Sequence, residues 1–503
     1  MKGQFLLNTA AFSSATLISR ILGYLRDATV AYVFGANPLT DAFFVAWRLP
    51  NTLRQLIGEG SFNAAFIPIY TQEEKKSPES AKEYASSLFT YYTLVLSVIT
   101  FFVVLFADVF VKILAPGFIE KGNFEETVKL VRIVFPYLIL IGWVSFFMAL
   151  LNTKDRFFLP AVTPALLNIS FIFSALFLSD KYGIYALAYG ALAGGILQVL
   201  IQLPLLKKEN LLIKPSFSLH PKIKETLKRL IPAFASFGVS QFAFVIDTVI
   251  ASFLVGGAIS YLYYGNRIFL LPMGLFAIGL GNALLVSLSK HFAEKDIKSF
   301  NHDVNMGIKL SFFISVPAMV GMLVLGIEII DVLLLRGAFT KEDALFTYYA
   351  LAGYSLGLTG YALTRPFKSA FFATGDTKTP LYSTIFGLIV GIISAIVFGF
   401  VLRWGVFGLA LASSLGGWAN AFYLYAVYPF DIHKKEIFIS LLKILTSSIL
   451  MGSFIILMKV YISSEIFIIV FGIPLAIVIY FSANYVLREP SLMFFINVLK
   501  KKL

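Results

Sequence analysis

The sequence of 503 residues contains no cysteine, and only 14% of its residues are charged. The absence of cysteine excludes disulfide bonds, thiolate metal sites and cysteine nucleophiles. Only four histidines occur, three of them in expected loops, which argues against a histidine metal cluster. Soluble domains carry about 25% charged residues, so the low charge content argues against a soluble protein.

Hydrophobic residues instead make up 58% of the chain, and the mean hydropathy is +0.83. A helix that crosses a bilayer needs roughly 20 apolar residues, and such runs recur to the C-terminus. We therefore expect an all-α polytopic membrane protein with about 14 transmembrane helices. Connections of at most about 25 residues leave no room for a soluble catalytic domain. The first apolar run follows the N-terminus directly, so no cleaved signal peptide is expected.

The net charge of +13 has an explanation in membrane topology. If the N-terminus is cytoplasmic, lysines and arginines concentrate in the loops on that same side, which is the usual bias of membrane proteins. The opposite loops carry mainly Lys121, Lys181, Arg336, Lys341 and Arg403. We therefore expect a multi-pass protein with both termini in the cytoplasm. Nucleic-acid binding is not needed to explain the basic residues.

The two halves of the chain repeat one pattern of charged residues, glycines and prolines. Asp27 and Asp247, like Gly117 and Gly337, are 220 residues apart. Further pairs at 219 to 222 residues are Arg48 and Arg267, Pro160 and Pro380, Gly183 and Gly405, Gly194 and Gly416, and Gly195 and Gly417. This offset predicts a duplicated six-helix unit. Because six is even, both copies enter from the same side, and the site is expected between them near the bilayer midplane.

The predicted division has two pseudo-symmetric six-helix lobes, at 1–205 and 226–428, separated by a cytoplasmic linker at 206–225. Residues 429–503 add two helices without a counterpart in the repeat. The expected spans are residues 5–35, 41–70, 84–115, 127–152, 157–179, 183–205, 226–256, 260–290, 308–336, 344–373, 379–402, 406–427, 436–461 and 464–487.

Charged residues in the first span are candidates for a functional site. A charge in a spanning helix costs a few kcal/mol or more, so it usually faces a bundle interior or a watery cavity. Arg20 and Asp27 share nearly one helix face, while Arg26 points about 120° away. An ion pair between Arg26 and Asp27 that only fixes packing is the structural alternative. That alternative does not explain Arg20.

The second span carries Asp41, Arg48 and Glu59 on one face, with Arg54 to the side. A proline and two glycines interrupt this span, so local unwinding is plausible. Asp27, Asp41 and Glu59 are candidates for gating or charge balance, with helix capping near the membrane surface as the structural alternative for Asp41 and Glu59. Four arginines against three carboxylates in the first two spans leave a surplus of positive charge. This surplus predicts an anionic ligand within the membrane.

The second half contributes Arg267, which has no carboxylate near it in sequence. If the halves face each other, Arg267 lies across the cavity from the first two spans. The planar guanidinium group suits bidentate phosphate recognition, so several arginines on one ligand would fit a pyrophosphate. Asp247 could bind a coupling cation, sodium or a proton, or pair with an arginine such as Arg267. The eleventh span has no acidic residue to share such a cation site.

The segment 436–487 is apolar around most of its circumference. Its two helices could simply face lipid. Alternatively, they could form the wall of a groove for an acyl or polyprenyl chain, and the sequence does not separate these readings.

Several motifs together resemble those of the MviN/MurJ family of lipid II flippases. They are SRILGYLRDATVAYVFGA, TDAFFVAWRLPNTLRQLIGEGSFNAAFIP, LNTKDRFFLPAVTPALLNIS, LLLRGAFTKEDA and TGDTKTP. The resemblance covers essentially the whole chain, including the two additional helices. It implies the multidrug/oligosaccharidyl-lipid/polysaccharide exporter fold, with two six-helix lobes around a cationic cavity and a two-helix lipid groove.

The resemblance also implies a substrate, site residues and a location. The family's cavity arginines fall on Arg20, Arg26, Arg54 and Arg267, and its acidic positions fall on Asp27 and Asp41. The implied substrate is lipid II, the undecaprenyl-pyrophosphate-linked disaccharide-pentapeptide, flipped across the bacterial cytoplasmic (inner) membrane by alternating access. We expect no cofactor and a functional monomer. Some relatives bind sodium near the seventh, eleventh and twelfth helices, but the missing acid in the eleventh span argues against that site here.

Three rival functions remain on the sequence alone. A drug or cation antiporter of the same superfamily predicts an acidic or aromatic cavity, against which the arginine surplus argues. A flippase for another polyprenyl-pyrophosphate-linked saccharide shares the same physics and differs only in the family motifs. A membrane enzyme that uses a polyprenyl phosphate needs catalytic carboxylates or a metal motif at a membrane face, and the sequence contains no such cluster.

Overall fold

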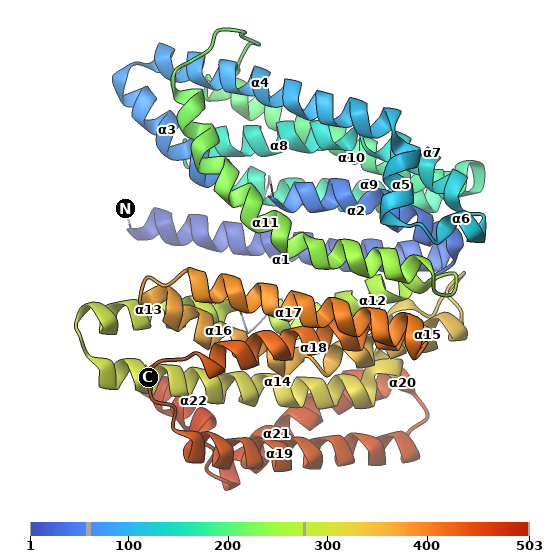
Figure 1. Cartoon of the computed structure of the whole chain (residues 1–503), viewed down its shortest axis with the longest axis vertical. Helices are drawn as coiled ribbons and strands as arrows, with labels where there is room; N and C mark the ends of the chain where they lie inside the picture. The colour runs from blue at the N-terminus through green and yellow to red at the C-terminus, as the bar shows by residue number, and fades with distance from the viewer. Residues whose placement is uncertain (1, 57–61, 275–277, 501–503) are drawn as a thin grey trace. The chain divides into compact units, whose positions relative to one another are not determined.

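A computed structural model describes residues 2–56, 62–274 and 278–500 of the chain (Figure 1). Every regular element within these ranges is a helix, as the all-α prediction expected. The physical reason is that a bilayer core offers no hydrogen-bond partners, so a spanning segment has to satisfy its backbone groups internally. The α-helix does so within a single segment.

The helices vary from one turn to more than ten turns in length. In chain order they are α1 (Lys2–Phe34), α2 (Pro38–Leu56), α3 (Phe62–Lys76), α4 (Pro78–Leu105), α5 (Ala107–Leu114), α6 (Phe118–Lys121), α7 (Phe124–Val134), α8 (Tyr137–Asn152), α9 (Phe158–Tyr182), α10 (Tyr185–Lys208), α11 (Lys222–Ser252), α12 (Ala258–Pro272), α13 (Ile278–Ala293), α14 (Ile297–Leu334), α15 (Lys341–Ser355), α16 (Leu358–Ala373), α17 (Lys378–Ile396), the π-helical η3 (Val397–Val401), α18 (Gly405–Ala426), α19 (Lys434–Tyr461), α20 (Glu465–Phe467), the π-helical η4 (Ile468–Gly472), α21 (Ile473–Val486) and α22 (Pro490–Lys500).

Eight helical segments within the described residues are long and apolar enough to cross a membrane. They are Pro78–Leu105, Phe124–Asn152, Phe158–Tyr182, Tyr185–Lys208, Ile297–Leu334, Lys378–Val401, Lys434–Tyr461 and Glu465–Val486. Several of the other expected spans are divided into shorter helices. Examples are 260–290, which consists of α12 and α13 around residues that the structure leaves undescribed, and 344–373, which consists of α15 and α16.

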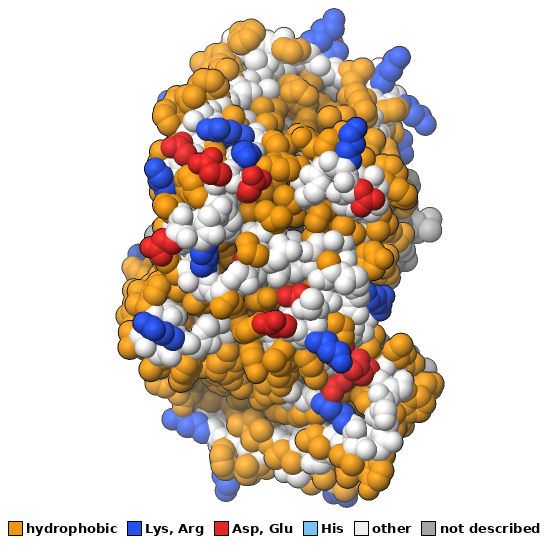
Figure 2. Space-filling view, turned by 90° about the vertical axis from the view of Figure 1, so that its right-hand side faces the viewer, with side chains coloured by type: hydrophobic (Ala, Val, Ile, Leu, Met, Phe, Trp, Pro, Cys, Tyr) orange, Lys and Arg blue, Asp and Glu red, His pale blue; other side chains and the backbone are white. Residues whose placement is uncertain are grey.

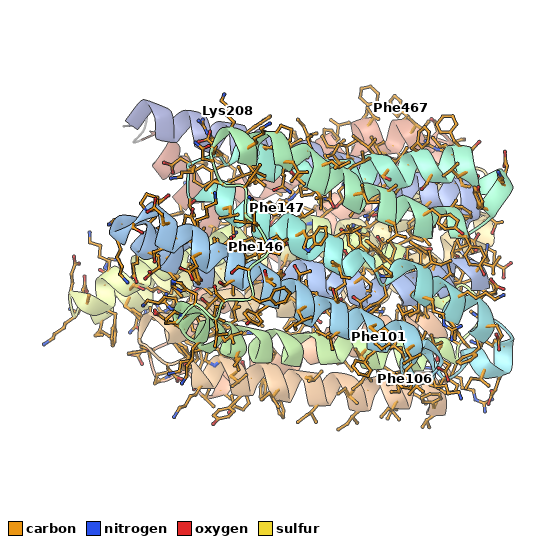
Figure 3. The ribbon with its side chains drawn as sticks, turned by 90° about the horizontal axis from the view of Figure 1, so that it is seen from above. Phe101, Phe106, Phe146, Phe147, Lys208 and Phe467 are labelled. Atoms are coloured by element: carbon orange, nitrogen blue, oxygen red, sulfur yellow. The ribbon has the colours of Figure 1, made fainter. Side chains whose placement is uncertain are left out.

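The surface of these segments is mostly apolar. Only 22% of the most apolar 18-residue stretch of α4 is buried inside the protein. For the corresponding stretch of Lys378–Val401 the buried share is 17%. Phe101 and Phe106 lie on the outer side of unit 1, whereas Phe146 and Phe147 lie in its interior (Figure 3). Hydrophobic side chains also cover much of the face seen in Figure 2, with charged side chains in small groups among them. Outward apolar faces of this kind suit contact with lipid.

The chain forms two compact units. Unit 1 comprises Met1–Ile259 and Arg336–Phe339, and unit 2 comprises Ser260–Leu335 and Thr340–Leu503. The helix α11 contacts α2, α3, α4 and α5 and therefore belongs to unit 1. This helix is held by contacts with residues far away in sequence, such as Tyr84, whose hydroxyl hydrogen-bonds with that of Thr226 at 2.7 Å. The start of the second lobe at residue 226 rests on the sequence repeat and stays a prediction.

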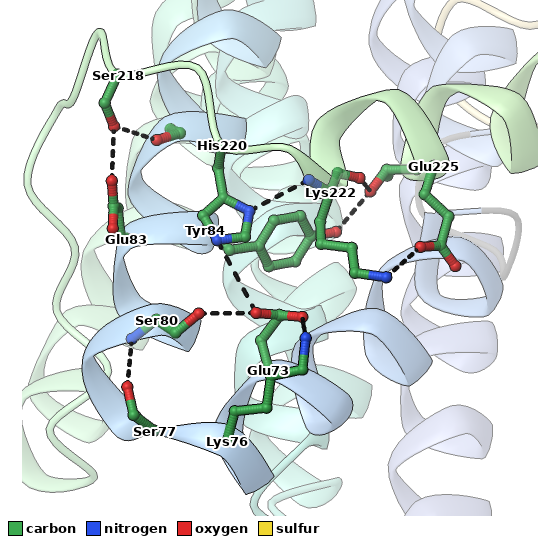
Figure 4. A network of polar contacts seen from close by, with 12 residues as sticks. Glu73, Lys76, Ser77, Ser80, Glu83, Tyr84, Ser218, His220, Lys222 and Glu225 are labelled. Carbon is green, nitrogen blue, oxygen red and sulfur yellow. Dashed lines mark hydrogen bonds and ion pairs between the residues drawn. The ribbon is translucent and has the colours of Figure 1, made fainter.

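The linker between α10 and α11 lies against the corner where α3 meets α4 (Figure 4). The Ser218 hydroxyl donates to Glu83 at 3.2 Å, and the imidazole of His220 lies 3.9 Å from the carboxylate of Glu73. Glu73 is buried and also accepts hydrogen bonds from Lys76 at 2.6 Å and Ser80 at 2.7 Å. These bonds fix the linker to the helices of unit 1.

The helix boundaries repeat with the offset that the sequence predicts. Three helices of the first half begin at positions matched by helices that begin 220 residues later. The starting pairs are Pro38 and Ala258, Phe158 and Lys378, and Tyr185 and Gly405. The break between α7 and α8 at Phe135 and Pro136 likewise corresponds to the break between α15 and α16 at Leu356 and Gly357.

Aromatic residues form much of the core of unit 1. Phe66 is fully buried and its ring contacts those of Phe62, Tyr84 and Phe146. A second aromatic group contains Trp47 and Phe171, whose ring centroids are 5.2 Å apart. The second group matters for function because Phe171 also contacts an arginine of α1.

Candidate substrate site

Arg26 and Asp27 form a buried ion pair in α1. The Nε and a terminal nitrogen of Arg26 donate to one Asp27 oxygen at 2.9 and 2.7 Å. Both residues are buried, with 9% and 6% of their surface exposed. The guanidinium also lies over the Phe171 ring, 5.7 Å from its centroid. Since an unpaired buried charge would be strongly unfavourable, Asp27 stabilises the charged form of Arg26 in this helix.

Arg20 lies two turns before this pair on α1 and is exposed. It makes no hydrogen bond or ion pair with any described residue. No described residue therefore occupies the guanidinium donors of Arg20.

Asp41 is almost fully buried, at 2% exposure, near the start of α2. One of its carboxylate oxygens accepts a hydrogen bond from the backbone amide of Gly257 at 2.7 Å. Lys121, the last residue of α6, donates to the carbonyl of Ser252 at 2.6 Å. This geometry favours the structural reading of Asp41, which is the binding of a free backbone amide at a helix start.

Two further candidate arginines are half-buried and lie over aromatic rings. Arg48 of α2 is 5.4 Å from the ring centroid of Phe244 in unit 1. Arg267 of α12 is 5.7 Å from that of Tyr263 in unit 2. Cation–π contact stabilises a guanidinium by roughly 0.5–2 kcal/mol. Both arginines are thus positioned by a ring face.

The remaining candidates divide into those that the structure describes and those that it does not. Glu59 lies outside the described residues, and so does the side chain of Arg54, whose backbone belongs to α2. Asp247 is half-buried in α11 and is not without a partner. Among the described residues, no group of three or more histidine, aspartate or glutamate side chains could hold a metal ion.

Sequence reasoning missed the aromatic rings that position the arginines. Tyr263 precedes Arg267 by four residues, so helical spacing alone could have identified it. Phe171 and Phe244 belong to helices distant in sequence from Arg26 and Arg48, and no local pattern indicates these contacts. Chemically, the arrangement combines guanidinium groups held by a carboxylate or a ring with an exposed arginine, which suits binding of an oxyanion.

Helices of spanning length and apolar composition define a polytopic membrane protein. A family model described as "Lipid II flippase MurJ" matches residues 30–477. The chain belongs to this lipid II flippase MurJ family. The membership confirms the resemblance that the sequence motifs carry.

Individual relatives agree over almost the full length. The chain is 36% identical over 479 residues to the "Probable lipid II flippase MurJ" of Aquifex aeolicus, covering 95% of this chain and 94% of that protein. It is 32% identical over 465 residues to the protein of the same name from Haemophilus influenzae, covering 87% and 89%. A solved structure of "Lipid II flippase MurJ, inward closed conformation" has a TM-score of 0.81 at 32% identity, covering 95% of this chain and 98% of that one.

A more distant match shows the fold alone. An inward-facing multidrug-resistance transporter of the MATE family, in the MOP superfamily, has a TM-score of 0.67 at 14% identity and covers 83% of this chain. This agrees with the exporter fold that the resemblance implied.

Proposed function

We propose that this protein flips lipid II from the cytoplasmic to the periplasmic leaflet of the bacterial inner membrane. The observation that carries the proposal is the family match over nearly the whole chain, and the arginines of α1, α2 and α12 add support for an anionic substrate. The lipid's polyprenyl tail can stay in the bilayer, so only the charged head has to cross. A cavity lined by arginines lowers the cost of that crossing, because it supplies charges that replace the water around the pyrophosphate.

Arg20, Arg26, Arg48, Arg54 and Arg267 are the proposed contacts of the pyrophosphate. Arg20 is exposed, whereas Arg48 and Arg267 are half-buried and lie over aromatic rings. Asp27 keeps Arg26 charged and oriented until the ligand arrives. Asp41 and Glu59 are proposed as gating or charge-balancing groups. Asp247 is proposed as part of a coupling-cation site for sodium or a proton.

Transport is proposed to occur by alternating access, with about 14 spans arranged as two six-helix lobes and two further helices. Beyond the eight segments of spanning length and composition, the remaining six spans are proposed to come from the single helices α1, α11 and α18 and from the divided segments α2–α3, α12–α13 and α15–α16. Both termini are proposed to be cytoplasmic, and the monomer is proposed to be the functional form.

The last two spans, α19 and α20–α21, are proposed to hold the polyprenyl tail in a groove. The support is their exposed apolar surface, for example Ile449 at 62% and Val470 at 55%.

Complementation tests the proposal. The chain would be expressed in cells depleted of their own lipid II flippase, beside Arg20→Ala and Arg267→Ala variants with membrane levels checked. The matched control is Arg229→Ala, which removes an exposed arginine paired with Glu225 near the start of α11. We expect rescue by the parent and the control only. Rescue by all variants would refute the arginine site, and no rescue by a well-expressed parent would favour another polyprenyl-linked saccharide.

A further inference from the structure

Two cations one turn apart on α16 lack a carboxylate partner among the described residues. Arg365 and Lys368 are both half-buried. The Nε atom of Arg365 is enclosed by the protein and has no hydrogen-bond partner. The ammonium of Lys368 donates to a neutral group, the hydroxyl of Thr384 on α17, at 3.0 Å. This part of unit 2 therefore carries two positive charges that no described side chain neutralises.

Two other lysines of unit 2, by contrast, each have a carboxylate partner. Lys309, at 6% exposure, donates to Glu436 at 2.8 Å. Lys459 lies 2.5 Å from a carboxylate oxygen of Glu328. Leaving a buried charge without a counter-ion is strongly unfavourable, and these two lysines avoid that cost. The contrast sets Arg365 and Lys368 apart, because no described residue supplies a counter-ion to either of them.

The surroundings hold the two cations in place without neutralising them. The Thr384 hydroxyl donates to the carbonyl of Pro380 at 2.8 Å, so its lone pair is available to Lys368. The helix α13 comes close to Arg365 at Gly281. The carbonyl of Gly281 also accepts a hydrogen bond from the Ser369 hydroxyl at 2.8 Å. A neighbouring helix is thus fixed beside the arginine through Gly281.

The next acidic residue along the chain is already engaged. Asp376 accepts hydrogen bonds from the backbone amides of Lys378 and Thr379 at 2.9 and 3.0 Å, and from the Thr379 hydroxyl at 2.6 Å. It thereby satisfies free amides at the start of α17. These three bonds hold the Asp376 carboxylate at the turn before α17, where it does not pair with Arg365 or Lys368.

We propose that Arg365 and Lys368 form an anion site for a phosphate or pyrophosphate group. An arginine presents two parallel donors to two phosphate oxygens, and a lysine adds a compact charge at a third. The two positive charges match a doubly charged anion. The residues differ from the arginines assigned to the site above, so this is an additional contact in unit 2.

The ligand could be the pyrophosphate of the transported lipid or a free inorganic anion. The first source rests on the proposed function, since it makes the pair a second station for the lipid head. The second source does not depend on that function. Both require the same chemistry from the protein, so binding measurements with the two ligands separate them.

The test is calorimetric binding to the purified protein in lipid nanodiscs. Inorganic pyrophosphate and undecaprenyl pyrophosphate would each be titrated into the parent, Arg365→Gln, Lys368→Gln and the double variant. The matched control is Lys290→Gln, an exposed lysine on α13 with 72% of its side chain accessible. We expect the double variant to lose at least about tenfold in affinity for one or both ligands, while the control stays unchanged.

A loss for the lipid alone assigns the site to the transported head, and a loss for the inorganic ion as well assigns it to the phosphate group itself. Equal affinities in the parent and the double variant would overturn the proposal, and so would a parent that binds neither ligand. Complementation run in parallel shows whether the flippase function survives either result.

Unfolding temperature without ligand gives a second measurement. If the counter-ion comes from outside, removing the two charges removes an unfavourable burial, so the double variant should be at least as stable as the parent. A clear loss of thermal stability would mean that the protein itself neutralises Arg365 and Lys368, which would refute the anion site.

Discussion

Gly337 lies against the backbone carbonyl of Tyr32, and the next amide, that of Ala338, donates to this carbonyl at 2.8 Å. The same relationship occurs between Gly117 and Ser252, where the amide of Gly117 donates to the serine hydroxyl at 3.0 Å. Residues 32 and 252, like residues 117 and 337, are 220 apart. Each half of the chain therefore places a glycine loop on the end of the first helix of the other half, and all of these residues belong to unit 1.

The two glycines predict graded losses of stability on substitution by alanine. At Gly337 a Cβ would meet Tyr32 and would also require a positive φ of 59°. At Gly117 it would meet Ser252 with an ordinary φ of −63°. The left-handed conformation costs about 1–2 kcal/mol and overpacking about 1–3 kcal/mol. Thermal unfolding in detergent should therefore show the larger loss for Gly337→Ala.

Gly122→Ala separates these two causes. Its φ is +80° and nothing lies within 4 Å of the new Cβ, so only the backbone strain applies. Its loss should resemble the difference between the two other variants. Equal stability of Gly117→Ala and the parent would show that the loop moves away at no cost, contrary to this account.

The Arg26–Asp27 pair predicts a strong asymmetry between single and double variants. Asp27→Asn removes the carboxylate that accepts two hydrogen bonds from the buried Arg26, and we expect a loss of up to about 3–5 kcal/mol. Replacing both residues, as in Arg26→Met with Asp27→Asn, also removes the positive charge and should recover much of that loss. Unfolding temperatures of Arg26→Met, Asp27→Asn and the double variant give the comparison. Additive losses would show that the two side chains do not stabilise each other.

Local pattern explains why the class of protein could be predicted from the sequence. Hydropathy identifies the apolar spans, because the free energy of transferring a residue into the membrane depends mainly on the residue type and not on contacts with distant segments. The Arg26–Asp27 contact was foreseen as an alternative because the two are neighbours. The 220-residue offset likewise follows from pairs such as Asp27 and Asp247 that can be read directly.

Contacts between distant segments could not be predicted in this way. The position of α11 in unit 1 depends on contacts such as Tyr84–Thr226 and Gly117–Ser252, which join residues more than a hundred positions apart. Lys459 was part of a segment described as apolar, and its partner Glu328 is 131 residues away. Hydropathy assigns both charges to spans but says nothing about which charges meet.

The Lys459–Glu328 pair gives a further prediction about stability. Glu328 is buried at 7% exposure, and Lys459 also donates to the carbonyl of Val324 at 3.0 Å. Lys459→Met should destabilise unit 2 by about 3–5 kcal/mol, because it leaves a buried carboxylate unpaired. Adding Glu328→Gln should restore part of this loss. Lys290→Met, at an exposed position, should change little, and a comparable loss there would indicate a general effect of removing a lysine.

The buried Glu73 predicts that stability depends on pH at the linker. Hydrogen bonds from Lys76 and then Ser80 lower the pKa of Glu73 below its usual value of 4.5. A carboxyl group with a lowered pKa stabilises the fold fully above its unfolded pKa and loses this contribution as the pH falls through its folded pKa. The stability gap between the parent and Glu73→Gln should therefore be constant above about pH 5 and shrink below about pH 4.

Thermal unfolding of both proteins between about pH 7 and pH 3 measures this gap. Glu83→Gln is the matched control, since Glu83 lies on α4 in the same corner, is exposed, and accepts one long hydrogen bond from Ser218 at 3.2 Å. Its gap to the parent should be small at every pH. A stability gap for Glu73→Gln that widened as the pH fell would contradict this prediction. It would mean that the charge of Glu73 does not stabilise the linker, which would then be held by the other contacts of Ser218, His220 and Thr226.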